Sequence, residues 1–441
     1  MDKQKIIKPI FPESESSSAI EHLRKLAYEG AERIYGSPLP NDVIDRLQYE
    51  LHTICANESA SYFLFLHNTI NAAKELDVWI GPGRGSAPGC LVNYCLGITK
   101  IDPIEHGLLF ERFMNPDRIE WPDIDIDFDV KGVGKIWQWL KEKHGKDNCA
   151  RIGIIDYVTH LLAGIHTCGY IVTPNNVNNY VPVTLVDDPN NQGQKTLVTM
   201  YDAFTLENMG FVKFDFLKLH TLSKMKECVH LIKEHKGINI DIDHIPVDDE
   251  KTLSLFQEGR TSGIFIFDSP NQQIYLRKLH PTIFSDLVMF NSLYRPGPID
   301  FIPSFIEKKN GRDKITYDLP VMEKYLKDTY GIMVYQEQMM LLSRRLANFT
   351  RSESNALRMA LAKKTKVEID LFKPKFIEGG KRNGYDSKVL EKIWADLERD
   401  APFLFNKSHA VAYTWLAYQT AYLKIHYPEE FERTVHGHLY C

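Results

Sequence analysis

The chain has 441 residues, of which 44% are hydrophobic and 25% charged, and a formal net charge of −5. This length allows two or three domains with a large buried core, and the composition is that of a globular protein. The net charge excludes a strong overall attraction to nucleic acid, so a polyanion would have to be held by local basic patches or through metal ions. The seven cysteines contain no CxxC pair, which argues against a disulfide framework and a zinc knuckle. No apolar run approaches 18 residues, so we expect a cytoplasmic protein that does not bind a membrane.

The first 80 residues have the pattern of helices followed by a glycine-rich turn. "SSSAIEHLRKLAYEGAERIYG" opens on a serine cap, and "PNDVIDRLQYELHTI" and "SASYFLFLHNTINAAKEL" follow. A short apolar strand, residues 78–80, then runs into "GPGRGS", where Ser86 stands at the cap of a following helix. Such a turn holds anions because the first helix amides are unpaired, although the spacing is neither the Walker nor the dinucleotide pattern. A plain tight turn is the alternative.

The segment "EWPDIDIDFD" alternates acidic and apolar residues. Its period of two predicts a strand with Ile124, Ile126 and Phe128 toward the core and the aspartates together on the other face. Neighbouring carboxylates on one strand face lie roughly 6–7 Å apart, and their repulsion costs on the order of a kcal/mol unless a cation neutralises it. The alternative is a solvated edge strand whose charges oppose aggregation.

A second strand is predicted at "FVKFDF", where Lys213 and Asp215 share one face before a helix begins near Thr221. A lone aspartate on a strand is usually structural, but coupled to the acidic segment it completes a metal site. Aspartates that hold two Mg²⁺ ions roughly 3.5–4 Å apart support in-line phosphoryl displacement. Because the glycine turn offers a seat for phosphates, this pattern favours nucleotidyl transfer from a triphosphate over simple hydrolysis.

From about residue 218 the sequence reads as mainly helical. Residues 341–375 hold nine basic and three acidic side chains, Lys364 among them, and a solvated helix face is the alternative to a binding surface. Near the end, polar residues precede a helix rich in aromatic residues. We expect the aromatic residues to be core, with the polar residues at the helix start as candidates to meet a phosphate or a base. These are Asn406, Lys407, Ser408 and His409.

Long sequence blocks resemble one known family. The run from "GPGRGSAPGC" to "PDIDIDFD", then "GIHTCGYIV", "GFVKFDFLKLHTL", "LYRPGPID", "YGIMVYQEQMM", "ALRMALAKK" and "FNKSHAVAYTWLAYQTAYLK", closely resembles the bacterial C-family replicative DNA polymerases, the alpha subunits of DNA polymerase III. The resemblance spans roughly residues 20–431. It implies that Asp123, Asp125 and Asp215 are the catalytic and metal-binding triad for two Mg²⁺ ions, with Asp127 as a neighbour. It also implies triphosphate contacts at Gly85, Ser86, Arg112, Lys213 and Arg358, beside the further nucleotide-binding candidates Lys364 and residues 406–409.

The resemblance further implies an α+β fold with a mixed-sheet, nucleotidyltransferase-type palm like that of polymerase beta. We expect the palm at residues 1–217 and large, mainly helical fingers at 218–441. The implied activity is DNA-directed DNA synthesis from deoxynucleoside triphosphates on a primer–template, in the cytoplasm and among replisome proteins.

The sequence departs from the family pattern in several places. The family begins with a phosphoesterase-like domain and continues with clamp-binding modules, whereas this chain starts at the palm and stops at Cys441. Residues 129–165 form a short connector, with room for about two helices, where the family carries its thumb. Met359, Ala362, Ile266 and Asp268 also replace residues typical of the family.

We therefore expect a truncated polymerase with impaired activity. Two other readings stay open. One is a catalytically weak or inactive relative that binds nucleic acid, and the other is an aspartate-based metal nuclease or phosphatase.

Overall fold

The computed structural model describes residues 16–115, 121–189 and 193–436. The chain forms two compact units. The first contains Met1–Ala87, Val92–Lys100 and Trp121–Glu227, and the second contains Pro88–Leu91, Ile101–Glu120 and Cys228–Cys441. The names palm and fingers stay proposals for these units.

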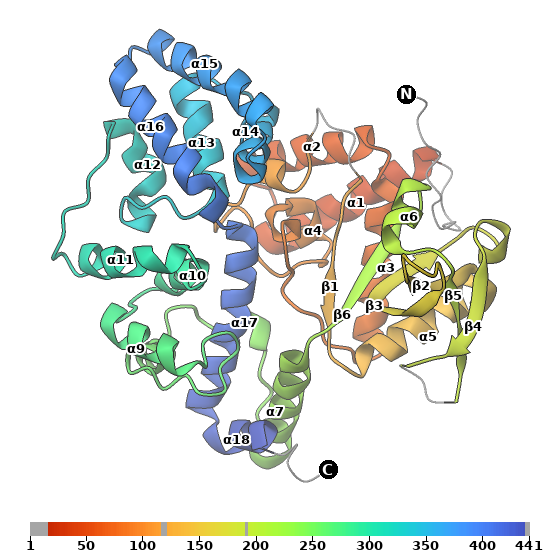
Figure 1. Cartoon of the computed structure of the whole chain (residues 1–441). Coiled ribbons are helices and arrows are strands. Elements are labelled where there is room, and N and C mark those ends of the chain that lie inside the picture. Colours follow the sequence, from red (N-terminus) through yellow and green to blue (C-terminus); the bar gives the residue numbers. More distant parts are fainter. Residues whose placement is uncertain (1–15, 116–120, 190–192, 437–441) are drawn as a thin grey trace. The chain divides into compact units, whose positions relative to one another are not determined.

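The first unit contains a mixed six-stranded sheet (Figure 1). Its strands are β1 (Ile126–Phe128), β2 (Cys149–Ile155), β3 (Leu162–Val172), β4 (Val183–Asp187), β5 (Lys195–Thr199) and β6 (Lys213–Lys218), in the spatial order β1-β6-β3-β2-β5-β4. The β1–β6 and β2–β5 pairs are parallel and the other neighbours are antiparallel. Together with the helices, this sheet confirms the predicted α+β class.

The helices of the first unit begin with the three that the sequence predicts. They are α1 (Ser16–Tyr35), α2 (Asn41–Ala56) and α3 (Ala60–Glu75), followed by α4 (Leu91–Cys95), α5 (Gly132–His144) and α6 (Ala203–Asn208). The helix predicted near Thr221 is α7 (His220–Lys236).

Aromatic side chains hold α3 and α5 against one face of the sheet. The ring centroids of Phe65 on α3 and Phe214 on β6 lie 4.2 Å apart, and those of Trp137 on α5 and Tyr170 on β3 lie 4.9 Å apart. Because side chains alternate along a strand, the burial of Phe214 turns Asp215 to the opposite face. The core thus fixes the strand that carries the acidic residue.

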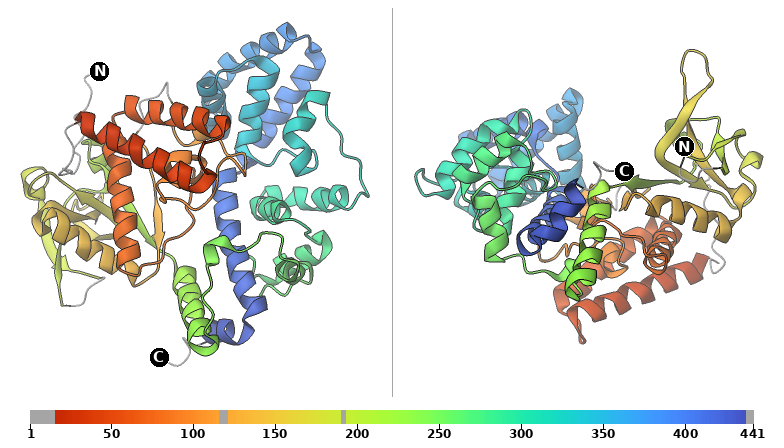
Figure 2. Two further views of the ribbon diagram at one scale, coloured as in Figure 1. Left: turned by 180° about the vertical axis from the view of Figure 1, so that it is seen from behind. Right: turned by 90° about the horizontal axis from the view of Figure 1, so that it is seen from below.

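The connector at residues 129–165 differs from the expectation of about two helices. It contains one helix, α5, and then the β2–β3 hairpin, which extends away from the rest of the sheet (Figure 2, yellow). Three large apolar side chains at its tip are exposed: Tyr157 at 77%, Val158 at 89% and Leu161 at 64%. The second half of this segment is therefore part of the sheet.

The second unit is mainly helical. Its helices are α8 (Glu250–Gln257), α9 (Pro270–Leu279), α10 (Phe284–Leu293), α11 (Ile302–Lys309), α12 (Glu323–Leu326), α13 (Gln336–Ala347), α14 (Arg351–Lys363), α15 (Lys366–Arg382), α16 (Ser387–Asp400), α17 (Lys407–His426) and α18 (Pro428–His436). Among the described residues, no helix combines the length and the apolarity needed to cross a bilayer.

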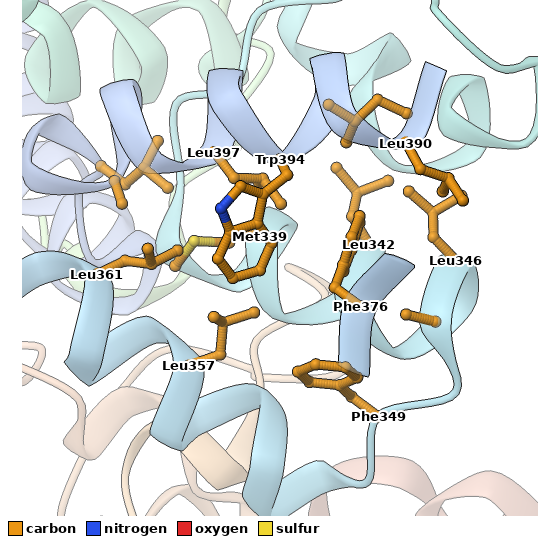
Figure 3. Close-up of a cluster of buried hydrophobic side chains, with 14 of the residues drawn as sticks. Met339, Leu342, Leu346, Phe349, Leu357, Leu361, Phe376, Leu390, Trp394 and Leu397 are labelled. Atoms are coloured by element: carbon orange, nitrogen blue, oxygen red, sulfur yellow. The ribbon is translucent and has the colours of Figure 1, made fainter. Parts of the chain in front are cut away.

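Helices α13 to α16 share a hydrophobic core (Figure 3). Leu342 of α13, Leu357 of α14, Phe376 of α15 and Trp394 of α16 are fully buried in it. Leu390, Trp394 and Leu397 recur on α16 at the spacing of one helical face, so that face points inward.

Candidate active site

Three carboxylates converge at the junction of β1 and β6. Asp123 and Asp125 lie in the segment that leads into β1, and Asp215 lies on β6. The register pairs Ile126 with Phe216, which brings Asp125 and Asp215, one residue earlier on each parallel strand, side by side. One oxygen from each of the three carboxylates lies within 4.8 Å of the others.

The cluster carries unfavourable negative charge. Burial raises the pKa of Asp125 to about 6, and the charges of Asp123 and Asp215 add to this shift. Partial desolvation also raises the pKa of Asp123, although that side chain keeps access to solvent, and the charge of Asp215 acts in the same direction. An all-oxygen ligand set with too little positive charge suits a hard divalent cation such as Mg²⁺.

Lys213 is the cation that β6 places beside this cluster. Its Nζ donates to Asp215 Oδ2 at 2.5 Å and lies 3.5 Å from Glu207 Oε1. Burial by itself would lower the pKa of Lys213, but the hydrogen bond and charge of Asp215 outweigh it and raise the pKa. Lys213 thus pairs with one of the three carboxylates.

Tyr62 on α3 ties the two acidic segments together, and the sequence patterns gave no sign of it. The backbone N–H of Ile124, between the first two aspartates, donates to the Tyr62 hydroxyl at 3.0 Å. The Tyr62 ring stacks on Phe214, next to Asp215, with centroids 5.7 Å apart. One side chain therefore contacts both segments that supply the carboxylates.

The other half of the acidic segment does not share this site. Asp129 accepts hydrogen bonds from Trp79 N at 2.8 Å and Gly132 N at 2.9 Å, and Lys226 Nζ lies 3.9 Å away. Asp127 is buried and pairs with Arg84 at 3.4 Å. Ile124, Ile126 and Phe128 are buried as predicted, but only Asp123 and Asp125 of the four aspartates belong to the carboxylate cluster, and regular strand geometry covers only residues 126–128.

The glycine-rich turn differs from its predicted form. The strand expected at residues 78–80 is reduced to a single bridge from Ile80 to Phe128, and Ser86 precedes the three-residue 3-10 helix Ala87–Gly89 instead of an α-helix. Gly85 has a φ of +60°, a conformation that other residues rarely adopt. The segment is thus a tight turn beside the acidic cluster.

Arg84 and Gly81 attach this turn to β1. A Cβ atom on Gly81 would lie 2.9 Å from Asp127 Cβ, so only glycine allows this approach. Arg84 pairs with Asp127, and its positive charge also acts to lower the pKa of Asp125. Arg84 was not among the predicted site residues, although a basic residue between two glycines near an acidic strand was an available signal.

The remaining predicted nucleotide-binding residues lie in the second unit. Arg112 ends the 3-10 helix Phe110–Arg112, and its Nε donates to Gln336 Oε1 at 2.8 Å. Burial lowers the pKa of Arg112. Lys407 Nζ donates to the His106 carbonyl at 2.7 Å, and its backbone N–H donates to the buried Glu337 carboxylate.

The start of α17 is held by local contacts. Asn406 caps the helix by accepting from Ser408 N at 3.1 Å, and the Ser408 side chain is fully buried. His409 packs its ring 4.3 Å from that of Tyr413. On α14 and after it, Arg358 is partly exposed and donates to Asn355 at 2.9 Å, while Lys364 is exposed.

The carboxylate triad is therefore assembled within the first unit. Gly85, Ser86 and Lys213 belong to that unit, whereas Arg112, Arg358, Lys364 and residues 406–409 belong to the second.

Comparison with known proteins matches both units. The family model described as the bacterial DNA polymerase III alpha NTPase domain matches residues 21–161 and 159–218, which is consistent with a polymerase beta-like palm. The model of the bacterial DNA polymerase III alpha subunit finger domain matches residues 221–384.

Among curated proteins, the DNA polymerase III subunit alpha of Aquifex aeolicus (strain VF5) is 34% identical over 506 residues, covering 93% of this chain and 43% of the relative. That of Staphylococcus aureus (strain MRSA252) is 36% identical over 450 residues, covering 88% of this chain and 42% of the relative. The chain thus spans less than half the length of these relatives. On these matches, the chain belongs to the family of bacterial DNA polymerase III alpha subunits.

Proposed function

We propose that this chain is a DNA-directed DNA polymerase that transfers nucleotides from deoxynucleoside triphosphates to a primer 3′ hydroxyl. The observation that carries this proposal is the convergence of Asp123, Asp125 and Asp215 within 4.8 Å. The cluster lies in the region that matches the alpha NTPase domain model. Primer–template DNA and deoxynucleoside triphosphates are the proposed substrates, and other replisome proteins are proposed partners.

The three aspartates are the proposed ligands of two Mg²⁺ ions. Bound Mg²⁺ would activate the attacking hydroxyl and stabilise the leaving oxygen. Asp125 must be ionised to act as a ligand, and its raised pKa of about 6 still leaves it ionised at neutral pH. Tyr62 holds the Ile124 backbone in place and so fixes the direction of the two flanking aspartates.

Lys213 is the proposed first contact of the triphosphate. It pairs with Asp215, so metal binding at Asp215 would free the ammonium group for a phosphate on the same strand face. Glu207, 3.5 Å from Lys213 Nζ, keeps the lysine nearby during this exchange. The Lys213 ammonium group would thus neutralise the carboxylate cluster before the substrate binds and the triphosphate during the reaction.

The other predicted nucleotide-binding residues fall into two groups according to their contacts. Gly85, Ser86, Arg112, Arg358 and the exposed Lys364 are proposed to contact the nucleotide. Asn406, Lys407, Ser408 and His409 make cap, backbone or ring contacts within the second unit. For these four, we propose a supporting role at the start of α17.

We further propose that the family's thumb is absent. The two matches to the NTPase domain model meet at residues 159–161, in the tip of the β2–β3 hairpin. The 506 positions aligned with the Aquifex relative exceed the 441 residues of the chain, so that relative has segments without a counterpart here. Loss of the thumb would reduce the grip on duplex DNA while leaving the carboxylate site intact.

Primer extension tests the proposed activity. The assay uses a short labelled primer–template, Mg²⁺ and all four deoxynucleoside triphosphates, at protein concentrations that compensate for weak DNA binding. We expect extension by the wild-type chain and by Asp147→Ala, which changes an exposed carboxylate outside the site, and none by Asp125→Ala. Extension that persists in Asp125→Ala would contradict the proposal.

A nucleic-acid-binding protein without polymerase activity is the second candidate. The short β2–β3 hairpin at the break in the family match favours it, because primer ends would be poorly held. Failure of the wild-type chain to extend primers, with DNA binding retained in a gel-shift assay, would support this candidate. Consumption of triphosphate without a primer would instead indicate a phosphatase.

A further inference from the structure

Asp215 belongs to a second cluster of possible metal ligands, which lies on the neighbouring strand. His166 and Cys168 are on β3, which pairs antiparallel with β6 so that Gly169 is opposite Asp215. One ligand atom from each of His166, Cys168 and Asp215 lies within 4.8 Å of the other two. The Asp215 carboxylate is therefore common to an all-oxygen cluster and to a cluster of nitrogen, sulfur and oxygen.

The distances in this second cluster fit a tetrahedral ion. Cys168 Sγ lies 3.7 Å from Asp215 Oδ1 and 3.8 Å from His166 Nδ1. A tetrahedral Zn²⁺ with bonds of about 2.3 Å to sulfur and about 2.0 Å to nitrogen and oxygen keeps neighbouring ligand atoms roughly 3.5 Å apart. The two separations from sulfur therefore need to shorten by only a few tenths of an ångström, and the His166 and Asp215 ligand atoms, which lie within 4.8 Å of each other, would move closer on binding. Thiolate and imidazole ligands favour Zn²⁺ over Mg²⁺, which binds oxygen.

A distortion of β3 explains why these side chains gather here. The β2–β3 pairing shifts its register between Arg151 and Gly153, which is where β3 carries His166. The buried Arg151 guanidinium donates to the His166 and Thr167 carbonyls at 2.9 and 3.2 Å, and so fixes the distorted backbone. The His166 ring folds back until its Nδ1 accepts from Gly169 N at 2.9 Å. Strand irregularities of this kind commonly redirect side chains beside functional sites.

The two oxygens of Asp215 point to different partners. Oδ1 lies toward Cys168, whereas Oδ2 accepts from Lys213 at 2.5 Å. An ion held by His166 and Cys168 would draw on the Oδ1 side of the carboxylate. Because β6 lies between β1 and β3, such an ion would pull the shared carboxylate toward β3 and away from Asp123 and Asp125.

We propose that His166, Cys168 and Asp215 form a zinc site, with water as the fourth ligand, whose occupation withdraws Asp215 from the carboxylate triad and inhibits DNA synthesis. On binding, the Cys168 thiol releases its proton to solvent, and Zn²⁺ replaces the Gly169 amide as the partner of His166 Nδ1. The inhibitory part of this inference rests on the proposed polymerase function, whereas the zinc site itself does not.

Cobalt spectroscopy tests the site independently of activity. Co²⁺ added to the full chain should give a thiolate-to-cobalt charge-transfer band and the intense visible bands of tetrahedral coordination. Cys168→Ala should remove the thiolate band, and Cys168→Ser serves as a second variant of nearly the same size. Cys55→Ala, which changes a partly buried thiol elsewhere in the first unit, should keep the band. Absence of the band in the wild-type chain would overturn the site.

Zinc titration measures the affinity and its consequence. Competition with a chromophoric chelator should show one Zn²⁺ bound. The affinity should fall in His166→Ala and Cys168→Ala by at least the roughly 10–100-fold that loss of an outer partner of a metal ligand costs. In primer extension with Mg²⁺, Zn²⁺ should inhibit the wild-type chain at concentrations at least roughly tenfold lower than those needed for Cys168→Ala, since loss of even an outer partner of a metal ligand costs that much affinity. Equal inhibition of both would overturn the coupling. If the wild-type chain shows no extension even without Zn²⁺, the proposed function fails, while the cobalt spectrum still decides the site.

Discussion

The two halves of the acidic segment show how one sequence pattern serves two purposes. Asp129, in the second half, receives two backbone hydrogen bonds and lies near Lys226, and Asp127 pairs with Arg84. Asp123 and Asp125, in the first half, face Asp215 and one another instead. The carboxylates of the first half therefore repel Asp215 and one another, and a bound cation would offset this repulsion. The carboxylates of the second half instead attach β1 to its surroundings.

This difference shows that an aspartate's partners, and not its place in an alternating pattern, decide its role. Backbone amides and Arg84 neutralise the second half from within the protein, so that half needs no metal to fold. Burial and neighbouring carboxylates raise the pKa of Asp125 despite the charges of Arg84 and Lys213, which marks the half where negative charge is in excess. The following variants test this contrast in order of the expected effect.

Asp125→Asn should have the largest effect on activity and a favourable effect on stability. Loss of one charged ligand should reduce primer extension on the order of 10³-fold, the upper range for removal of a preorganised electrostatic group. In the presence of a chelator, the melting temperature should stay the same or rise, because the substitution removes a desolvated negative charge from the cluster. Extension assays and thermal melts with a chelator measure the two outcomes. A large fall in the melting temperature would show that Asp125 is structural.

Asp129→Asn should show the opposite combination. The asparagine keeps one acceptor oxygen but loses the charge-assisted contact to Trp79 N or Gly132 N, which should lower the free energy of unfolding of the first unit by about 1.5–3 kcal/mol. Urea denaturation measures this loss. At a temperature where the variant stays folded, primer extension should be close to wild type, because the triad is retained. If Asp129→Asn had normal stability but no activity, Asp129 would be a catalytic residue and not a structural one.

The sequence predicted the parts of this structure that depend on local patterns. Helices α1, α2 and α3, strand β6 and helix α7 follow from caps and periodicity. The resemblance to the polymerase family supplied the three aspartates that the structure brings together. Local patterns gave the wrong extent for β1 because its regular geometry depends on pairing with β6, a strand distant in the sequence.

Other features depended on partners that no local pattern specifies. Residues 149–155 pair with β3 and β5, so their strand state is decided by tertiary contacts and was not predicted. Arg84 lies on the glycine-rich turn and Tyr62 on α3, and both are distant in sequence from the acidic segment. They contact the site only because the fold brings the turn and the helix against that segment. Alternation alone also could not show that Asp127 and Asp129 are neutralised within the protein.

Metal binding should weaken in acid with a midpoint set by Asp125. The pKa of this group is raised to about 6 in the metal-free protein, so protons compete with the cation below that pH. The affinity for Mn²⁺ should fall by about tenfold per pH unit below that pKa and level off above it.

Because the pKa of Asp125 is raised in the folded state, its contribution to folding is most favourable at low pH, where both folded and unfolded states are protonated. This contribution declines as the pH rises toward 6.

Calorimetric titration with Mn²⁺ between pH 5 and 8 measures this dependence. Asp125→Asn should bind weakly with a flatter pH profile, since the group that titrates is gone. A wild-type affinity that is constant across the range would mean that Asp125 is not a ligand. Asp129, in the second half of the segment, is not a proposed ligand. Asp129→Asn should therefore keep the wild-type pH dependence of the Mn²⁺ affinity.

Tyr62→Phe should have the smallest effect and tests whether the contrast depends on positioning. The phenylalanine keeps the stacking on Phe214 but leaves the Ile124 amide without its acceptor. The Mg²⁺ concentration for half-maximal extension should rise about three- to tenfold. This is at or below the lower end of the roughly 10–100-fold range for loss of an outer partner, because Tyr62 holds the backbone between two ligands and not a ligand side chain. The rate at saturating Mg²⁺ should change little, because the ligands themselves remain.

Tyr418→Phe is the matched control for this effect. The Tyr418 hydroxyl also accepts from a backbone amide, Asp249 N, at 3.0 Å, but in the second unit. Both variants leave a backbone amide unsatisfied, which costs about 1–3 kcal/mol of stability. Only Tyr62→Phe should change the Mg²⁺ dependence, because only its amide lies between two metal ligands. If both variants shift that dependence equally, the effect reflects general destabilisation, and Tyr62 does not position Asp123 and Asp125.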